Sequence, residues 1–321
     1  MTEFTKKIPA SIGIFGATGH IGTPMARWLR YNAPGTRLRL MTSNPGSVAG
    51  LQQAFPDCEV AIGDFYDLPG LTKAVDGLEG LFVVPPNGTR EEVAMTNLVD
   101  ALKRSGSLVH MIRTLGIFPH MNPRRIPAEL VQMGMGLEVQ HPIARRILED
   151  SDLPVTFFNL GASFLDNFLR PRFEMLSPGK VTWPDRRVPM IDPREIGEAA
   201  ARILLSDNAR HIHQFQTLNN GSDYITMGEM VRIMSEELLI DIEHDSSKEG
   251  LFALLEPAVR AGKVREGMPE YLWNFFRYED ANDVAWVLND FLERTLGRKP
   301  NTVRGWIREH REQLRAKLRP A

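Results

Sequence analysis

The sequence has a single cysteine, Cys58, among its 321 residues. One thiol cannot form a disulfide within the chain, and it cannot assemble a thiolate metal cluster. A chain without structural disulfides is typical of a reducing compartment, so we expect a cytoplasmic location.

The chain also lacks an excess of charge of one sign and any long apolar run. It carries 38 Lys and Arg residues against 40 Asp and Glu residues, a formal net charge of -2. This balance offers no basic surface for nucleic-acid phosphates and disfavours a nucleic-acid partner. No window approaches the roughly 18 uninterrupted apolar residues of a membrane span, so we expect no membrane partner. We expect a small-molecule substrate, and the sequence leaves monomer and homodimer both open.

Metal-ligating side chains are sparse, with eight histidines in the whole chain. His211 and His213 would share a face if they lay on a strand. Glu243, His244 and Asp245 offer further ligands, but they stand apart in the sequence. Two histidines without a placed third ligand are usually packing or solvated residues, so we predict no metal site.

What the chain does have, in its first half, is a regular alternation of short apolar runs with helical patterns. Six apolar runs predict strands, at residues 11–15, 37–41, 59–62, 81–84, 108–112 and 155–160. Helical spacing between them predicts helices at about 20–31, 67–76, 91–104 and 142–150. This is the sequence form of βαβ units. We therefore expect an α/β fold, with a Rossmann-type doubly wound parallel sheet over residues 1–160.

The remaining residues, 161–321, predict a smaller, mixed, substrate-binding region. Asp192, Pro193 and Glu195 have the spacing of a capping box, with Asp192 as the cap and Glu195 reaching back to it. We expect the helix that follows, over 194–206, to pack back on the Rossmann domain. Further helices are predicted near 226–238, 283–295 and 302–318. The irregular stretch 116–140 is long for a simple connection and suggests a lid.

A glycine-rich run directly follows the first predicted strand. Glycine at Gly16 and Gly19 lets the backbone approach a pyrophosphate, and Gly22 lets the next helix pack closely. Backbone N–H groups at the start of that helix would point at the phosphates. An ordinary tight turn also uses glycines, but the strand before and the helix after favour a dinucleotide site. Its predicted cofactor-binding residues are Gly16, Thr18, Gly19, His20, Ile21 and Gly22.

The end of the second predicted strand indicates which dinucleotide binds. NAD-specific proteins usually carry an acid there, which binds the ribose hydroxyls. This chain has Thr42, Ser43 and Asn44 at that place, and their neutrality removes a charge that would repel a 2′-phosphate. We therefore expect NADP(H) to be favoured over NAD(H), with Arg37 and Arg39 close by in sequence.

Several motifs along the chain resemble one family. They are the run from Gly16 to Gly22, the Gly-Asp-Phe-Tyr-Asp at 63–67, the Gly-Leu-Phe-Val-Val-Pro at 80–85, the segment 148–167 and the Leu-Gly-Arg-Lys-Pro at 296–300 with Trp306. Together they resemble the NmrA-like branch of the atypical short-chain dehydrogenases/reductases. The resemblance spans nearly the whole chain and implies an NAD(P)-binding oxidoreductase.

The resemblance also implies roles for residues outside the glycine loop. It places Asp64 and Phe65 near the adenine, and Pro85, Pro86 and Asn87 over the nicotinamide half. It places Phe164, Asn167 and Phe168 in the wall of the substrate pocket.

The catalytic pattern of ordinary short-chain reductases is missing. None of the five tyrosines is followed by a lysine in a Tyr-x-x-x-Lys pair. Many NmrA-like reductases keep a lysine before the sixth strand, and His141 occupies about that place here. Thr114 stands where the family often has a serine. We therefore predict His141 and Thr114 as catalytic residues, with His141 as an imidazolium proton donor or as a plain helix-start histidine.

Three functions remain open at this point. The first is an NADP(H)-dependent reductase of a medium-sized, aromatic or quinone-like carbonyl or conjugated substrate. The second is a redox sensor that binds NADP(H) and a protein partner without turnover, which the missing tyrosine and lysine favour. The third is a non-redox enzyme that keeps the dinucleotide as a structural element, since a fold alone does not separate these functions.

Overall fold

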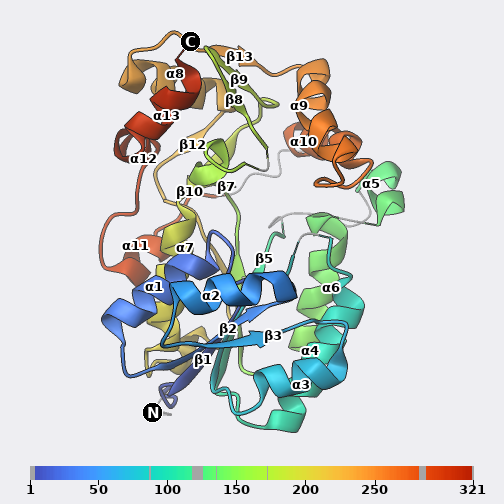
Figure 1. The fold of residues 1–321 in the computed structure, drawn as a ribbon, viewed down its shortest axis with the longest axis vertical. Helices are drawn as coiled ribbons and strands as arrows, with labels where there is room; N and C mark the ends of the chain where they lie inside the picture. The colour runs from blue at the N-terminus through green and yellow to red at the C-terminus, as the bar shows by residue number, and fades with distance from the viewer. Residues whose placement is uncertain are drawn as a thin grey trace.

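The structure is a computed structural model that describes residues 4–86, 88–117, 126–134, 136–171, 173–281 and 287–319. Its largest element is a seven-stranded sheet in the order β11-β6-β5-β4-β1-β2-β3, in which all neighbouring strands run parallel (Figure 1). The strands are β1 Ser11–Phe15, β2 Arg37–Thr42, β3 Glu59–Ile62, β4 Gly80–Val83, β5 His110–Leu115, β6 Val155–Asn159 and β11 Phe215–Thr217. The predicted α/β Rossmann-type class is confirmed, and the strand order reverses between β1 and β4.

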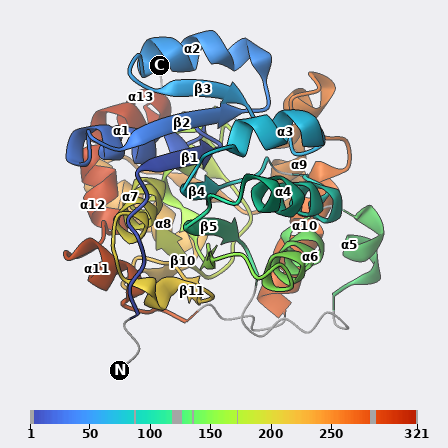
Figure 2. The same ribbon diagram turned by 90° about the horizontal axis from the view of Figure 1, so that it is seen from below.

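Helices cover both faces of this sheet, as the view from below shows (Figure 2). One face carries α1 Gly22–Asn32, α7 Pro193–Leu204 and α11 Phe291–Leu296, and the other carries α3 Leu68–Val75, α4 Glu91–Ser105 and α6 Leu137–Glu149. Every residue of β1, β4, β5 and β6 is buried, as expected for strands covered on both sides. The 3-10 turn Pro45–Ser47 and α2 Val48–Ala54, which the sequence did not predict, connect β2 to β3.

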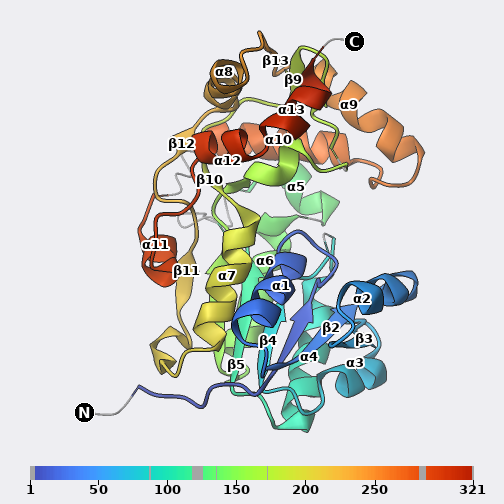
Figure 3. The same cartoon turned by 60° about the vertical axis from the view of Figure 1, so that its left-hand side comes forward.

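A second region stands over the carboxyl ends of the strands (Figure 3). It contains two small sheets, β7 Ser163–Phe164 with β10 Val188–Ile191 and β12 Tyr224–Ile225, and β8 Leu176–Ser177 with β9 Lys180–Thr182 and β13 Glu243–Asp245. Its helices are α8 Met227–Leu238, α9 Lys248–Arg260, α10 Met268–Ala281, α12 Val303–Glu309 and α13 Arg311–Leu318. Around Met234, Trp306 and Leu314 these elements form an apolar core of their own. The short helix α5 Ala128–Met133 precedes α6.

Two segments beyond residue 160 belong to the large sheet rather than to this second region. Strand β11 pairs with β6, and α7 packs on α1. A Cβ atom on Gly197 of α7 would lie 2.8 Å from the carbonyl oxygen of Ile21. The glycine therefore lets α7 approach the start of α1, where the glycine-rich run ends.

The helix cap at Asp192 is only half as predicted. The Asp192 carboxylate accepts a hydrogen bond from the Arg194 N–H at 3.0 Å and so caps α7. Glu195 does not reach back to close a capping box, because its carboxylate instead accepts from the guanidinium of Arg298 and the N–H of Asn301. Glu195 therefore binds Arg298 and Asn301, which lie in a distant segment, rather than the local backbone N–H of Asp192.

Three predicted helix boundaries also differ from the structure. The helix expected at 142 begins at Leu137, with Pro142 inside it. The helix expected over 302–318 is interrupted at His310, whose ring stacks on Trp306 with 4.3 Å between centroids. Of the helix expected over 283–295, residues 283–286 lie outside the described residues, and the described part begins at Phe291.

Candidate functional site

The glycine run forms a tight turn between β1 and α1. Gly16 has a φ angle of +75°, which favours glycine, and the Gly19 N–H donates to the Gly16 carbonyl oxygen at 2.9 Å. A Cβ on Gly22 would lie 2.3 Å from that same oxygen, whereas a Cβ on Gly19 would lie 3.1 Å from it. Gly22 is therefore the most constrained of the three, because the start of α1 crosses directly over the turn.

The beginning of α1 is open to an anion. No side chain caps this helix at Ile21. The N–H groups of Thr18, His20 and Ile21 donate to no partner in the described part of the chain. Unpaired N–H groups at a helix N-terminus, together with the helix dipole, favour a bound phosphate. The turn therefore fits the pyrophosphate of a dinucleotide, with Thr18 exposed at its tip and the Ile21 side chain buried in the core.

The turn after β2 is neutral, and part of its hydrogen bonding is internal. Thr42 is buried, and its hydroxyl accepts the Asn44 N–H at 3.1 Å. The Asn44 side chain accepts the Gly46 N–H at 3.0 Å. Ser43 is exposed, and no hydrogen bond of its side chain occurs within the described ranges. Ser43 is thus the side chain of this turn that is free to meet a cofactor phosphate.

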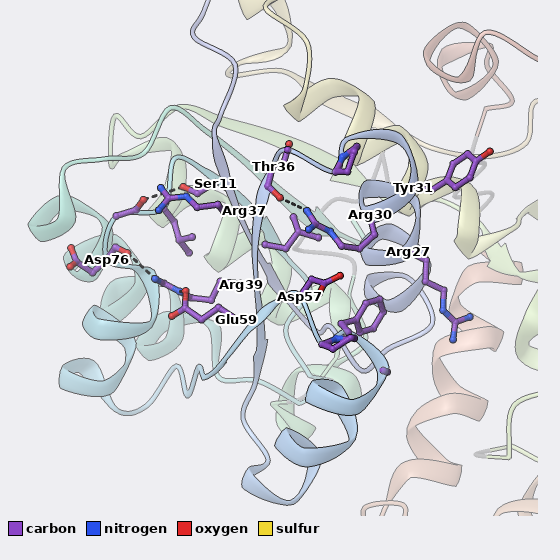
Figure 4. A pocket seen from close by; sticks show the side chains of 18 residues that line it. Ser11, Arg27, Arg30, Tyr31, Thr36, Arg37, Arg39, Asp57, Glu59 and Asp76 are labelled. Atoms are coloured by element: carbon purple, nitrogen blue, oxygen red, sulfur yellow. Dashed lines mark hydrogen bonds and ion pairs between the residues drawn. The ribbon is translucent and has the colours of Figure 1, made fainter.

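The two arginines of β2 are not part of that turn. Arg37 begins the strand, and Arg39 forms an ion pair with Glu59 at 2.8 Å and donates to the carbonyl oxygens of Ala74 and Asp76. Both line an open pocket at the amino edge of the sheet, together with Arg27, Arg30 and Tyr31 (Figure 4). Parallel strands bind dinucleotides at their carboxyl edge, so this pocket is a separate feature.

The residues that the resemblance places around the adenine shape the loop after β3. The Asp64 carboxylate accepts the Tyr66 N–H at 2.9 Å, which closes an Asx turn. Phe65 is buried and stacks on Phe15, with ring centroids 4.7 Å apart. Phe65 therefore offers a ligand its backbone rather than its ring.

The loop after β4 holds the residues expected over the nicotinamide half. Pro85 is partly exposed, Pro86 is exposed, and the Pro86 carbonyl oxygen accepts the Thr89 hydroxyl at 2.7 Å. A Cβ on Gly16 would lie 3.0 Å from the Val84 carbonyl oxygen, so this loop adjoins the glycine turn. Asn87 lies outside the described residues.

The predicted substrate segment touches the glycine turn at one point. The His20 ring lies edge-on to Phe164, with centroids 5.0 Å apart, and His20 Nδ1 lies 2.8 Å from Asp166 Oδ2. Asn167 is partly buried, with its amide oxygen 3.4 Å from Arg170. Phe168 turns away and packs near Trp306 in the second core. The structure thus brings Phe164 to the glycine turn and leaves Phe168 buried.

The two predicted catalytic residues lie at the carboxyl end of β5 and on α6. Thr114 is buried and donates its hydroxyl hydrogen to the Val83 carbonyl oxygen at 3.2 Å. His141 Nδ1 accepts the Gly116 N–H at 2.6 Å, which leaves Nε2 to carry the ring hydrogen. Burial, helped by the positive charge of Arg113, lowers the pKa of His141 to about 3. His141 is therefore neutral at physiological pH and does not supply the imidazolium expected from the sequence.

Two buried polar groups at this end of the sheet escaped the sequence analysis. Arg113 and Glu91 form an ion pair at 2.5 Å, with side chains 0% and 3% exposed, and Glu91 Oε1 lies 4.0 Å from His141 Nε2. Glu138, one turn before His141 on α6, is 1% exposed and accepts the Tyr271 hydroxyl at 2.8 Å. The sequence signal for the ion pair was Arg113 itself, an arginine inside an apolar strand. No local pattern indicated that Glu91 is its partner.

Asn159 also escaped the sequence analysis. Its side chain accepts the N–H of Ile117 at 2.7 Å and donates to the Ile117 carbonyl oxygen at 2.8 Å. Together with the Gly116–His141 hydrogen bond, this contact fixes the first residues after β5. The carboxyl edge near β5 is therefore held by side chains from β6 and α6.

No group of three or more His, Cys, Asp or Glu side chains within the described ranges is arranged to hold a metal ion. His211 ends a 3-10 turn, and His213 has a φ angle of +63°, so the two do not share a strand.

Among the helices of the described residues, none has the length and apolar character needed to cross a membrane.

A parallel sheet with this strand order, and a glycine turn at its switch point, defines a Rossmann-type dinucleotide-binding fold. Residues 9–253 match the NmrA-like family, and the chain belongs to that family. The resemblance inferred from the motifs is thereby confirmed.

Known proteins agree with this assignment. An NmrA-like family domain-containing oxidoreductase of Aspergillus hancockii is 28% identical over 166 residues, about half of each chain, at 49% and 48%. The triphenylmethane reductase of Citrobacter sp. superposes with a TM-score of 0.73 at 22% identity, covering 94% of this chain and 99% of that one. An NADPH-dependent quinone oxidoreductase of Escherichia coli gives a TM-score of 0.72 at 20% identity, covering 94% and 99%. At such identities the two structural likenesses concern the fold.

Proposed function

We propose that this chain is an NADPH-dependent reductase of a medium-sized carbonyl, quinone-like or conjugated substrate. The observation that carries the proposal is the turn from Gly16 to Gly22, whose unpaired N–H groups meet the uncapped start of α1. Two structural relatives support the choice of cofactor, since the Citrobacter reductase was solved with NADP(H) and the Escherichia coli enzyme with NADPH.

In this proposal, three loops each bind a different part of the cofactor. The glycine turn would hold the pyrophosphate, and the neutral turn at Ser43 and Asn44 would receive the 2′-phosphate without repulsion. The loop at Pro85 and Pro86 would border the nicotinamide half. When bound, a reduced nicotinamide supplies the hydride, and the protein supplies binding, orientation and electrostatics.

His141 acts in this proposal as a hydrogen-bond donor and not as an acid. Its Nδ1 is held by the Gly116 N–H, so the Nε2–H of the neutral ring can point to a substrate oxygen. A neutral imidazole polarises a carbonyl by a hydrogen bond but does not give up its remaining proton near pH 7. Its anchoring by Gly116 fixes the ring orientation, which a hydrogen-bond donor to a developing charge requires.

The direct test is binding followed by turnover. Fluorescence titration of the purified protein with NADPH and NADH measures the two affinities. NADPH oxidation is then followed with menadione, benzaldehyde and cinnamaldehyde as a quinone, a simple carbonyl and a conjugated carbonyl. We expect tighter binding of NADPH and its oxidation by at least one probe. Failure to bind either dinucleotide contradicts the proposal.

One observation favours a second candidate, a redox sensor without turnover. Neither Thr114 nor the neutral His141 offers a readily transferable proton where the family's usual donors would stand. A sensor should bind NADPH and NADP⁺ with affinities that differ by tenfold or more, and no probe should consume NADPH. Turnover of any probe at rates typical of enzymes rejects the sensor.

A further inference from the structure

A buried carboxyl group lies beside the proposed substrate site without a full set of partners. Glu138 sits in the first turn of α6, three residues before His141, so their Cβ atoms are neighbours about 5–6 Å apart on one helix face. The Glu138 side chain is 1% exposed. Its Oε2 accepts the Tyr271 hydroxyl at 2.8 Å, while its Oε1 has no hydrogen-bond partner among the described residues. A buried oxygen without a partner calls for a ligand or a proton.

The position of Glu138 is fixed from both regions of the molecule. On the Rossmann side, the His141–Gly116 hydrogen bond ties α6 to the end of β5, and the Gln140 side chain accepts the Glu91 N–H at 3.0 Å. On the other side, Tyr271 belongs to α10 of the second region. The carboxyl group therefore stands where the carboxyl edge of the sheet meets the region that covers it.

The surroundings of Glu138 favour its protonated form. Burial raises the pKa of Glu138, and its own backbone N–H and the Tyr271 hydroxyl oppose this only in part. The facing charged groups are Glu279 on α10, whose pKa burial also raises, and Arg186, which lies 3.0 Å from Glu279. Arg186 thus neutralises Glu279, while His141 beside Glu138 is uncharged. The other buried pair nearby, Glu91 with Arg113, is balanced by itself.

We propose that the carboxyl group of Glu138 donates the proton that the substrate oxygen needs during reduction, with Tyr271 as the positioning residue. The inference rests on the proposed reductase function. It supplies the acid that neither Thr114 nor His141 provides, and it restricts the substrate to one whose reduced group carries an oxygen.

The step balances for a carbonyl substrate. The carbonyl carbon receives the hydride from the reduced nicotinamide, a C–H bond forms, and the electron pair of the C=O π bond moves to oxygen. The proton leaves Oε1 of Glu138, and an O–H bond forms at that oxygen, so that the carbonyl becomes an alcohol. The resulting Glu138 carboxylate keeps the Tyr271 hydrogen bond and regains a proton from water.

The first test compares Glu138→Gln with Glu149→Gln, the same substitution at the exposed far end of α6, where Glu149 pairs with Arg145. For both variants we expect NADPH dissociation constants within about twofold of the unmodified protein. With menadione or benzaldehyde, kcat of Glu138→Gln should fall about a hundredfold or more, the usual contribution of a general acid. Glu149→Gln should retain its kcat.

The second test is the pH profile of kcat. In the unmodified protein, kcat should fall as the pH rises through the pKa of Glu138, and this basic limb should be absent in Glu138→Gln. Tyr271→Phe should move the limb to higher pH, because the lost hydrogen bond had favoured the ionised carboxylate. A purely structural Tyr271 would leave the limb in place.

A third test needs no turnover and no cofactor. The infrared difference between the ligand-free unmodified protein and Glu138→Gln at neutral pH should contain the carbonyl band of a protonated carboxylic acid. A carboxylate band in its place overturns the proposal. Where Glu138→Gln fails to fold, as judged by circular dichroism, the Tyr271→Phe profile decides, and an unshifted limb overturns the proposal.

The outcomes separate this inference from the proposed function. If Glu138→Gln reduces the probes as fast as the unmodified protein, Glu138 is not the acid, and the reductase function stands. If the unmodified protein binds NADPH but reduces none of the probes, both the function and the role of Glu138 are overturned.

Discussion

At the scale of single residues, the buried Arg113 shows how one side chain constrains a site. An arginine in the centre of a strand, 0% exposed, has to meet an anion, and Glu91 supplies it from the first turn of α4. Burial is the main cause of the low pKa of the nearby His141, and the charge of Arg113 lowers it further. The same charge that holds α4 to β5 therefore helps to keep the proposed hydrogen-bond donor neutral.

Removing the charge of Glu91 should be costly for stability. Glu91→Gln leaves the Arg113 charge buried without a counter-ion, which should lower the free energy of unfolding by about 3–5 kcal/mol. Urea denaturation followed by circular dichroism measures it. The exposed pair of Arg145 and Glu149 is the control, and Glu149→Gln should change stability by about 0.5 kcal/mol or less. An equal loss in both variants would contradict the buried-charge argument.

The glycine turn makes a sharper residue-scale prediction than the motif alone. In Gly22→Ala the new Cβ would lie 2.3 Å from the Gly16 carbonyl oxygen, so the turn or the start of α1 has to shift. We expect NADPH affinity to fall at least tenfold, measured by fluorescence titration. The control is Gly35→Ala, where nothing lies within 4 Å of the added Cβ. Unchanged affinity in a folded Gly22→Ala would mean that the turn does not bind the pyrophosphate.

The choice of NADPH rests on the exposed Ser43. An aspartate there would bind the ribose hydroxyls of NADH and repel the 2′-phosphate of NADPH. Ser43→Asp should therefore reverse the preference, as isothermal calorimetry with both dinucleotides can show. Ser43→Ala controls for the lost hydroxyl and should keep NADPH preferred. A native protein that binds NADH at least as tightly as NADPH would contradict the assignment.

At the scale of elements, the strands of the large sheet were predictable and several helices were not. Strands β1, β4, β5 and β6 are short, largely apolar runs because both of their faces are buried, which is a local signal. Helix α2 buries only Leu51 and contains Gly50, so its sequence shows little helical periodicity. The strand β11 is partly buried throughout, and only its pairing with β6 identifies it.

The candidate site likewise has one part that could be predicted from the sequence and another that could not. The turn at Gly16 to Gly22 is one continuous segment, so its geometry could be read from spacing. The contacts of Glu138 with Tyr271 and of His20 with Asp166 join residues 133 and 146 positions apart. No local pattern encodes such pairs, because they depend on how the second region packs over the sheet.

The N-terminal segment gives a prediction at this scale, because it anchors the end of α7. Lys6 Nζ donates to the carbonyl oxygens of Leu204, at 3.0 Å, and of Ser206. Leu204 ends α7 and Ser206 lies two residues beyond it, where a cation also interacts favourably with the helix dipole. Lys6→Met should therefore lower the free energy of unfolding by about 1 kcal/mol in urea denaturation.

The neighbouring Lys7 provides the control for this anchor. Its side chain is 63% exposed and pairs with Glu79 at the surface. Lys7→Met should change stability by no more than about half a kcal/mol, because exposed ion pairs contribute little. Equal changes in the free energy of unfolding for the two substitutions would show that Lys6 stabilises the fold no more than an exposed ion pair does.

At the scale of the whole molecule, the sheet gathers the loops after β1, β2, β3, β4 and β5 at one edge, and the second region covers that edge. The interior that this creates also buries ionisable groups. His110 is 0% exposed, with Nε2 2.8 Å from the Thr156 hydroxyl, and burial lowers its pKa to about 3. With His141 it makes two histidines that are neutral in the folded chain.

These two histidines predict how stability depends on pH. In the unfolded chain each titrates near 6.5, so between pH 6.5 and about 3 the unfolded state binds more protons than the folded state. Their contribution is complete above pH 6.5 and is lost as the pH falls. From pH 7 to pH 5 each costs about 2 kcal/mol, at 1.36 kcal/mol for each pH unit below 6.5.

The raised pKa values of Glu138 and Glu279 act in the opposite direction. Their contribution is complete below about pH 4.5 and is lost as the pH rises through their folded-state pKa, which weakens the trend between pH 4.5 and that pKa. His110→Asn isolates the histidine term, since it removes one titrating group and leaves both carboxyls. The difference in the free energy of unfolding between pH 7 and pH 5, measured by urea denaturation, should therefore be about 2 kcal/mol smaller in His110→Asn than in the unmodified chain. An identical pH dependence in the two proteins would mean that His110 is protonated in the folded state, and that the region around β5 and β6 admits water.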